Sequence, residues 1–401
     1  MKRILFVIDS LGSGGAEKSL ISLLRLLDYR RYRVDLLLFA PKGLYLPLLP
    51  AEVNLLEAPA FFARQRAGAG RLLRDARWGD LWARARASYS IRHPLRRRRF
   101  HGAQLAWRSY ADRIEPLPGA YDVAVAYSQG MPTYFVADKV RAKKKLTWLN
   151  TDYIQANYNP AFDRGYYASY DKVVTVSEAG RDIFSEAFPD IGRGAEVVYD
   201  IVSPRLIREM ANDPEAFEDD GFEDDGFRGV TVLTIGRLVL QKGYDLAVRA
   251  CRMLADDGID VRWCVIGEGE YEAELRQEIA RLGLERRFLL LGTRQNPYPY
   301  LRRCDVYAQP SRFEGFGLAV AEARILGKPI VATNYPAVHD QIRHETNGLV
   351  CGMTDRELYA AVKRLIEDEA LRRRLGAAAA AERVGTEAEL EKIYALLDAS
   401  S

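Results

Sequence analysis

The chain has 401 residues, of which 48% are hydrophobic and 28% charged, a composition that excludes a disordered or collagen-like protein. At roughly 100–200 residues per domain, this length predicts two or three domains, each with its own core. The net charge of +3 argues against a dedicated nucleic-acid binder, but it is the sum of a basic first half and an acidic second half. Residues 1–200 carry 31 basic and 21 acidic side chains, against 27 and 34 in the remainder.

The first predicted elements form a strand–helix–strand unit. Residues 3–9 read as a continuous apolar strand of the kind buried in parallel sheets, and the run is too short for a signal peptide. A glycine loop, Gly12–Gly15, leads into a helix over 16–27 with leucines on one face, and a strand follows over 34–39. Further strands are predicted at 122–127, 145–149 and 172–176.

The glycine loop fits neither of two common nucleotide motifs. Glu17 occupies the third glycine position of a dinucleotide fingerprint, and the strand over 34–39 is followed by no carboxylate that could hold a ribose. Glu17 also replaces the second glycine of a P-loop, where its charge would oppose a triphosphate. Two interpretations stay open: a helix N-terminus that holds an anion or a polar sugar, and a tight turn without a ligand.

A strongly basic segment spans residues 64–113, with 14 arginines and only three acidic residues. Four side chains at helical spacing form an apolar stripe: Trp78, Leu81, Trp82 and Ala85. A basic amphipathic helix with tryptophan is typical of a surface for anionic lipid headgroups, and Arg96–Arg99 could meet the diphosphate of a lipid-linked acceptor. Two alternatives stay open: a solvated helix whose stripe packs on the sheet, and a nucleic-acid-binding arm.

The pattern changes over residues 206–228, which include a tandem Phe-Glu-Asp-Asp-Gly repeat and predict an acidic linker. Strand–helix alternation then restarts. Strands are predicted at 229–236, 261–267, 288–292, 305–310 and 329–333, and helices at 244–257, 270–283 and 315–326, with a last helix over 387–397. Two successive α/β units predict two doubly wound Rossmann-like domains.

The second half contains all four cysteines, and no two of them form a C-x-x-C pair, so we expect buried free thiols rather than a zinc site. The four histidines also lack metal-binding spacing. No uncharged apolar run reaches the ~18 residues of a membrane-spanning helix. We therefore expect a cytoplasmic protein, at most peripheral at the inner face of the cell membrane, with no metal.

Charged residues follow two strands of the second unit. Gly236-Arg237 ends one strand and Lys242 follows in the turn, so two cations suited to a diphosphate are expected at the ligand-binding edge of the sheet. Glu314 and Glu322 lie eight residues apart after the strand at 305–310, either two turns apart on one helix or one on the loop and one inside it. Carboxylates are strong acceptors for sugar hydroxyls.

These motifs resemble retaining glycosyltransferases of family 4, which have the GT-B fold, with two Rossmann-like domains facing a central cleft. The resemblance rests on Gly236-Arg237 with Lys242-Gly243, on Glu314 and Glu322 in the context EGFGLAVAEA, and on weaker matches at 14–17, 174–178 and 347–350. It implies an enzyme of bacterial cell-surface glycan synthesis that uses a nucleotide sugar, most often a UDP-sugar, as substrate and needs no further cofactor.

The resemblance also implies roles for individual residues. Arg237 and Lys242 hold the donor diphosphate, near Gly236, and Glu314 accepts hydrogen bonds from the transferred sugar. Further donor contacts fall on five positions: Gly15 near the diphosphate, the backbone of Phe316, Gly317 and Leu318, and Glu322 on the ribose. Arg294 falls where the family cradles the base. One departure stands out, because Asn150 replaces the usual histidine of a W-x-H-x-D motif and cannot carry a proton or a positive charge.

The resemblance assigns residues 1–205, with the basic segment, to an acceptor-binding domain and residues 229–384 to the nucleotide-sugar domain. The helix within 385–401 is expected to pack back on the first domain. The predicted function is metal-independent, retaining transfer of a sugar to a membrane-associated acceptor, lipid-linked or polysaccharide, with membrane contact through 64–113 and no nucleic-acid partner. The alternative is an inactive protein of the same fold that binds sugar nucleotides or anionic polymers.

Overall fold

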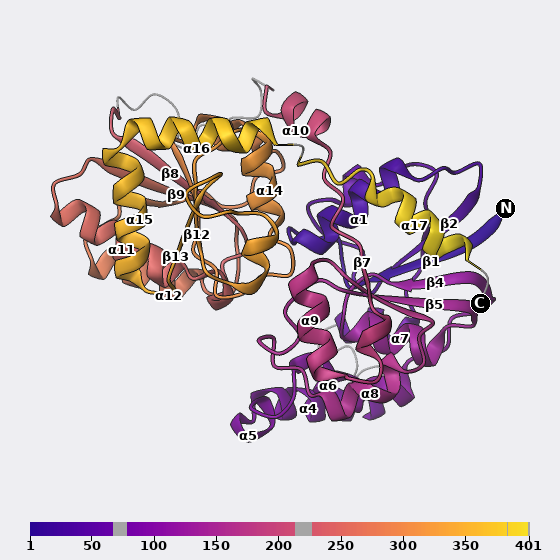
Figure 1. Cartoon of the computed structure of the whole chain (residues 1–401). Helices are drawn as coiled ribbons and strands as arrows, with labels where there is room; N and C mark the ends of the chain where they lie inside the picture. The colour runs from indigo at the N-terminus through magenta and orange to yellow at the C-terminus, as the bar shows by residue number, and fades with distance from the viewer. Residues whose placement is uncertain (67–77, 213–226, 383, 400–401) are drawn as a thin grey trace. The chain divides into compact units, whose positions relative to one another are not determined.

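The computed structural model describes residues 1–66, 78–212, 227–382 and 384–399 (Figure 1). It contains two compact units. The first comprises Met1–Asp200 with Glu389–Ser401, and the second comprises Ile201–Ala388.

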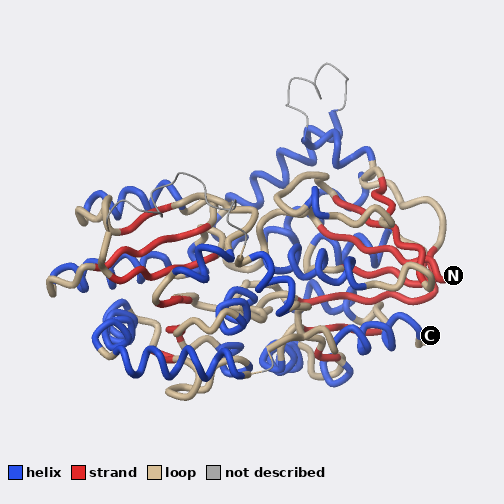
Figure 2. Tube along the Cα trace, turned by 90° about the horizontal axis from the view of Figure 1, so that it is seen from above, coloured by secondary structure: helices blue, strands red, loops and turns tan. Residues whose placement is uncertain are grey.

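The first unit is built on a seven-stranded parallel sheet with strand order β3-β2-β1-β4-β5-β6-β7. Figure 2 shows strands of this sheet in red beside the N-terminus. The strands are β1 Lys2–Ile8, β2 Tyr32–Leu38, β3 Asn54–Leu56, β4 Tyr121–Ala126, β5 Ala142–Leu149, β6 Lys172–Thr175 and β7 Glu196–Val197. The five strands expected from apolar runs are all present. The edge strands β3 and β7 were not predicted, because two or three residues are too few to show a pattern.

Helices cover this sheet: α1 Gly15–Leu26, α2 Ala60–Arg66, α4 Trp78–Arg92, α5 Pro94–Arg97, α6 Gly102–Tyr110, α7 Met131–Lys139, α8 Pro160–Tyr167, α9 Glu178–Ala187 and α17 Glu389–Asp398. Helix α1 begins after the extended Gly14 and buries a leucine face through Leu20, Leu23 and Leu24. Its leucines pack against the sheet because the helical repeat places residues three and four apart on one side.

Helix α17 brings the end of the chain back to its start. Figure 1 shows the yellow α17 beside β1 and β2. The Lys2 Nζ lies 3.2 Å from Asp398 Oδ1, and the rings of Tyr32 and Tyr394 stack with centroids 5.8 Å apart. The start of β1 and the end of α17 therefore lie side by side in the first unit (Figure 1).

The second unit has a six-stranded parallel sheet with order β10-β9-β8-β11-β12-β13. The strands are β8 Val230–Ile235, β9 Val261–Ile266, β10 Phe288–Leu290, β11 Val306–Gln309, β12 Ile330–Thr333 and β13 Leu349–Cys351. The helices are α10 Pro204–Met210, α11 Tyr244–Asp256, α12 Glu272–Arg281, α13 Tyr298–Arg303, α14 Leu318–Ile325, α15 Asp355–Glu367 and α16 Glu369–Ala381. Three of the four free cysteines are buried, whereas Cys351 is half-buried because β13 is an edge strand.

The strand orders confirm two doubly wound Rossmann-like units. In each sheet the chain moves outward over three strands and then returns to the other side of the first, so that β1 pairs with β4 and β8 pairs with β11. The carboxyl ends of the strands at this reversal are where ligands bind in such sheets. In the second unit, that edge carries the residues that follow β8 and β11.

The predicted linker over 206–228 is wrong for its first residues. Residues 206–210 belong to helix α10, which starts at Pro204, buries Ile207 and packs against α13 and α14. The carbonyl of Met210 accepts a hydrogen bond from Asn296 Nδ2 at 2.8 Å. The acidic tandem repeat lies outside the described residues.

The apolar stripe of α4 does not pack on the sheet, which rules out one of the sequence-based alternatives. The side chains that α4 buries are small or paired: Asp80, Ala83, Ala87 and Ser90. Trp78 and Trp82 are instead 66% and 63% exposed. Small buried residues allow α4 to pack closely against α6, and this contact turns the tryptophans toward solvent.

Candidate functional site

The charged residues of the second unit meet at the carboxyl end of β8 and β11. Gly236 and Arg237 follow β8, and the Gly236 carbonyl accepts a hydrogen bond from Tyr244 OH at 2.7 Å. Gly243 ends this turn with a φ of 67°, and a Cβ there would lie 1.9 Å from the Pro310 carbonyl oxygen. Only glycine allows this approach, and it brings the turn that carries Lys242 against the loop that carries Glu314.

Glu314 is a buried carboxylate held by three donors. Its Oε1 accepts hydrogen bonds from Lys242 Nζ at 2.6 Å, Ser311 Oγ at 2.6 Å and Gln309 Nε2 at 2.9 Å. All three bonds converge on the same oxygen, so Oε2 has no hydrogen-bond partner among the described residues. The carboxylate therefore has a defined orientation and one oxygen available as an acceptor, which suits a sugar hydroxyl.

The two predicted cations differ in their surroundings. Lys242 is 17% exposed and paired with Glu314. Arg237 is exposed, and no carboxylate lies within ion-pair distance of it in the part of the chain that the structure describes. The site therefore combines a lysine held by its carboxylate with an arginine whose guanidinium is open to a diphosphate.

Glu314 and Glu322 occupy the second of the two arrangements expected from their spacing. Glu314 lies on the loop, and Glu322 lies inside α14, which begins after Gly317 at a φ of 87°. Phe316 and Leu318 flank this start and are mostly buried. The first N–H groups of a helix have no partner within it, so the backbone at Gly317 and Leu318 is oriented to contact an anion.

Helix α13 connects the two outer donor positions. Glu322 is only 2% exposed, and its Oε1 accepts a hydrogen bond from Tyr298 OH at 3.1 Å. Arg294 Nε donates to Tyr300 OH at 3.1 Å. Both tyrosines belong to α13, so one short helix positions the predicted ribose and base contacts.

Four residues of this site were not found from the sequence. Gln309 and Ser311 hold Glu314, as described above. Tyr335 and Gln341 lie beside Gly317: a Cβ at Gly317 would be 3.2 Å from Tyr335 OH and 3.5 Å from Gln341 Nε2. Both side chains are buried, and Tyr335 OH and Gln341 Oε1 have no hydrogen-bond partner among the described residues. Tyr335 and Gln341 follow β12 at the same edge of the sheet, and this position is the sequence feature that could have predicted them as site residues.

With this geometry in place, the comparison with known proteins identifies the unit. Residues 225–382 match the family model of glycosyl transferases group 1. The match covers Arg237, Lys242, Glu314, Glu322 and Tyr335, and it confirms the resemblance to a glycosyltransferase of the family 4 type.

Curated relatives of the chain are named as glycosyltransferases. An N-acetylgalactosaminyltransferase of Campylobacter jejuni that acts on N-acetylgalactosamine-N,N'-diacetylbacillosaminyl-diphospho-undecaprenol is 25% identical over 227 residues, which are 55% of this chain and 59% of its own. The lipopolysaccharide core mannosyltransferase LpsB of Rhizobium meliloti is 33% identical over 152 residues, 36% and 43% of the two chains. The chain spans about half the length of the curated relatives it matches.

Solved structures show the same fold over the whole chain. Anabaena Alr3699/HepE in complex with UDP-glucose superposes with a TM-score of 0.73 at 22% identity, covering 99% of both chains. A mutant of TarM from S. aureus in complex with fondaparinux, alpha-GlcNAc-glycerol and UDP gives a TM-score of 0.66 at 16% identity, covering 100% of both. The predicted GT-B fold is therefore confirmed.

In the first unit, the predicted residues Gly15 and Asn150 follow β1 and β5. Gly15 is the first residue of α1. The Asn150 Nδ2 donates to the Tyr127 carbonyl at 2.6 Å, and its backbone N–H donates to Gln129 Oε1 at 2.9 Å. Because a carbonyl can only accept, this contact fixes the amide orientation and leaves Oδ1 buried with no hydrogen-bond partner among the described residues.

Asp200 is a titratable group of this unit that the sequence analysis missed. It is 6% exposed, and burial raises the pKa of its carboxyl to about 7, with an opposing effect from a hydrogen bond to Ser19. The Ser19 hydroxyl also lies 3.1 Å from Tyr127 OH, whose ring stacks on Trp148 at 5.3 Å. Asp200 is therefore linked through Ser19 to the Tyr127 hydroxyl. Asn150 contacts the backbone carbonyl of the same tyrosine.

Proposed function

We propose that the chain is a retaining glycosyltransferase that moves a sugar from a UDP-sugar to a lipid-linked or polysaccharide acceptor in cell-envelope glycan synthesis. The observation that carries this proposal is the pair of half-buried Lys242 and buried Glu314 beside the open Arg237 at one sheet edge. The relatives named above as glycosyltransferases, and the solved structures named as complexes with UDP or UDP-glucose, support it.

In this proposal, the main task of the second unit is to stabilise negative charge on the departing nucleotide. As the bond between the sugar C1 and the β-phosphate oxygen breaks, negative charge grows on the departing nucleotide. Arg237 and Lys242 stabilise this charge more than the ground state, which lowers the barrier. The Lys242 ammonium has three N–H donors, so it can keep Glu314 and still reach a phosphate. Two cations in these positions make the proposed transfer metal-independent.

The sugar is held rather than attacked by the protein. Glu314 accepts hydroxyl hydrogen bonds through Oε2, Glu322 binds the ribose, and Arg294 lies at the base. Retention follows when the acceptor oxygen bonds to C1 on the face that the nucleotide leaves, while the acceptor hydroxyl proton passes to the departing β-phosphate. No protein nucleophile is needed in this scheme.

Asn150 limits the chemistry that the first unit can contribute to the transfer. Its Oδ1 can accept a hydrogen bond from a sugar or acceptor hydroxyl, whereas a histidine at this position could also donate or carry a charge. We assign Asn150 to orienting a hydroxyl, so the proposed mechanism routes no proton through it.

We also propose a cytoplasmic, peripheral enzyme whose first unit binds the acceptor and contacts an anionic membrane through residues 64–113. Among the described residues, no helix has the length and apolar character needed to cross a bilayer. The exposed Trp78 and Trp82 and the excess of arginine support this contact. Nucleic acid is not part of the proposal.

A second candidate is an inactive sugar-nucleotide-binding protein, which Asn150 favours because it lacks a titratable group. One experiment separates the two: UDP-, GDP- and ADP-sugars are screened for nucleotide release, and UDP is titrated by calorimetry. The enzyme is expected to release UDP and bind it, with the anomeric configuration of the product retained by NMR. The inactive protein would bind UDP without release, and absence of UDP binding would remove both proposals.

Matched arginine variants control this experiment. Arg237→Ala should weaken UDP binding, because the guanidinium contacts the diphosphate in the proposed site. Arg249→Ala removes the same charge from the surface of α11, where Arg249 pairs with Glu278, and should leave UDP binding unchanged.

A further inference from the structure

A groove on the first unit lies between the end of α4, α5 and α6. Its volume is about 710 Å³. Four arginines line it together with the rings of tryptophan, tyrosine and phenylalanine: Arg86, Arg96, Arg99, Arg108, Trp82, Tyr89 and Phe100. The groove therefore combines aromatic surface with four positively charged side chains.

These arginines have no carboxylate partner among the described residues. Three of their guanidinium groups are nevertheless oriented by other contacts. The guanidinium of Arg86 lies 5.4 Å from the Trp82 ring, and that of Arg108 lies 5.1 Å from the Phe100 ring. Arg96 Nη1 donates to Ser90 Oγ at 2.8 Å. Contacts with rings and a hydroxyl orient a cation without neutralising it, so the groove has a positive potential suited to an external anion.

Arg64 in the same unit has surroundings of the opposite kind. It is bound by Asp80 at 2.7 Å and by Glu115 at 3.1 Å. The four groove arginines have no such carboxylate partner among the described residues, so their charge is not compensated in this way.

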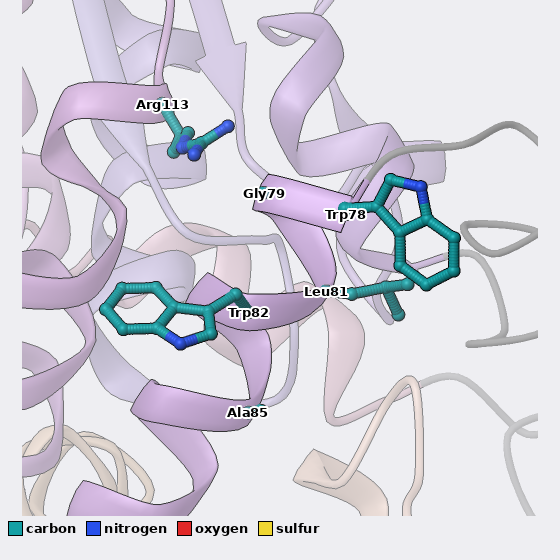
Figure 3. Close-up of a pocket in the computed structure, with 6 residues that line it drawn as sticks. All are labelled: Trp78, Gly79, Leu81, Trp82, Ala85 and Arg113. Carbon is teal, nitrogen blue, oxygen red and sulfur yellow. The ribbon is translucent and has the colours of Figure 1, made fainter.

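An apolar surface continues from the groove through Trp82. A second hollow of about 610 Å³ is lined by Trp78, Leu81, Trp82, Ala85 and Arg113, and Figure 3 shows the two indoles and Leu81 projecting from α4. On the other side of the groove, Leu95 is 65% exposed. A basic pocket flanked by exposed tryptophan and leucine matches a ligand with a phosphate head and an apolar tail.

We propose that this groove binds the terminal phosphate or diphosphate of a lipid headgroup, with Trp78, Trp82 and Leu95 entering the membrane interface around it. Arginine forks bind phosphate oxygens in pairs, and the rings of Trp82 and Phe100 hold two of the guanidinium groups in place. Phosphate binding depends only on the groove. Identifying the lipid as the glycan acceptor rests on the proposed function.

The run Arg96–Arg99 supplies a matched pair of variants. All four are exposed, but only Arg96 and Arg99 line the groove. The double variants Arg96→Gln/Arg99→Gln and Arg97→Gln/Arg98→Gln therefore remove the same charge from the same segment. Thermal unfolding of both variants checks that each is folded.

Three probes separate a phosphate site from a charged surface. Inorganic pyrophosphate is titrated by calorimetry with UDP in excess, so that a donor site in the second unit is already filled. Co-sedimentation is measured with phosphatidylcholine vesicles containing phosphatidic acid, and with charge-matched vesicles containing phosphatidylglycerol, whose phosphate is not terminal. Duplex DNA is added as a competitor.

We expect pyrophosphate and phosphatidic acid vesicles to bind the unmodified chain, and phosphatidylglycerol vesicles to bind less. The Arg96/Arg99 variant should lose about tenfold or more in affinity, as expected for charge-assisted hydrogen bonds, and the Arg97/Arg98 variant much less. Equal losses in both variants, equal binding to the two anionic vesicles, or displacement by duplex DNA would overturn the proposal. Pyrophosphate binding without vesicle binding would leave a free phosphate as ligand and overturn the lipid assignment. If UDP itself does not bind, the proposed function fails while these measurements still test the groove.

Discussion

The two clusters of cations in this protein are built in opposite ways. In the second unit, the half-buried Lys242 lies 2.6 Å from the buried Glu314, which Ser311 and Gln309 also bind. In the first unit, the groove arginines lie against rings and solvent with no carboxylate among the described residues. A buried, compensated charge contributes to a fixed geometry, whereas an exposed and uncompensated one remains available to an anion from outside. Stability and binding should therefore respond differently to mutation in the two places.

The largest effect is expected from Lys242→Ala. Removing one partner of a buried ion pair leaves Glu314 charged without its cation, which should lower the free energy of unfolding by about 3 kcal/mol or more. Nucleotide release from a UDP-sugar should also fall by more than about tenfold. Chemical denaturation and a turnover assay measure the two effects.

Arg237→Ala is the control for this comparison. Arg237 is exposed, so its removal should change the free energy of unfolding by less than about 0.5 kcal/mol, while turnover falls by more than about tenfold. Loss of stability similar to that of Lys242→Ala would show that the two cations are not built differently.

Asp200 extends the comparison to a buried carboxylate without a cation. Its pKa is raised from 3.8 to about 7 in the folded chain, so the folded state binds this proton more tightly than the unfolded state. The free energy of unfolding should therefore fall as pH rises from about 4 to 7, by up to about 1.4 kcal/mol per pH unit from this group. Asp200→Asn should remove that slope, as measured by denaturation at several pH values. An unchanged slope would contradict the raised pKa.

Tyr335 and Tyr307 both have buried hydroxyls, but only the Tyr307 hydroxyl has a hydrogen-bond partner among the described residues. Tyr335 OH has no partner among the described residues, so Tyr335→Phe should raise the free energy of unfolding by up to about 1 kcal/mol while weakening UDP-sugar binding. Tyr307 OH donates to Gln309 Oε1, so Tyr307→Phe should lower it by about 1–2 kcal/mol. Destabilisation by both variants would mean that Tyr335 OH has a protein partner.

The smallest effect on stability is expected at the exposed tryptophans. Trp82→Ala should change the free energy of unfolding by less than about 0.5 kcal/mol, while binding to anionic vesicles falls. Trp107 is 1% exposed, and Trp107→Ala should cost about 3–5 kcal/mol. Loss of stability at Trp82 comparable to that at Trp107 would place its side chain in the core instead.

Local pattern was sufficient for most of the fold. Long apolar runs predicted β1, β4 and β8, because a strand buried on both faces must be apolar throughout. Glycines at turns and charged residues after strands located Arg237, Lys242 and Glu314, since parallel strands end at one sheet edge. The short edge strands β3, β7 and β13 and the helix α10 were missed, because two to seven residues carry too little periodicity.

The sequence by itself determined that two α/β units exist, that the first is basic, and which charged residues lie at the ends of strands. Only the tertiary structure decided which charges are paired. Lys242 and Glu314 are 72 residues apart, and their contact depends on Gly243 packing against the loop after β11. The direction of the α4 stripe was likewise set by packing, because small residues on the opposite face fit α6 more closely than tryptophan could. Pairing and exposure are properties of contacts between distant segments, and no local pattern contains them.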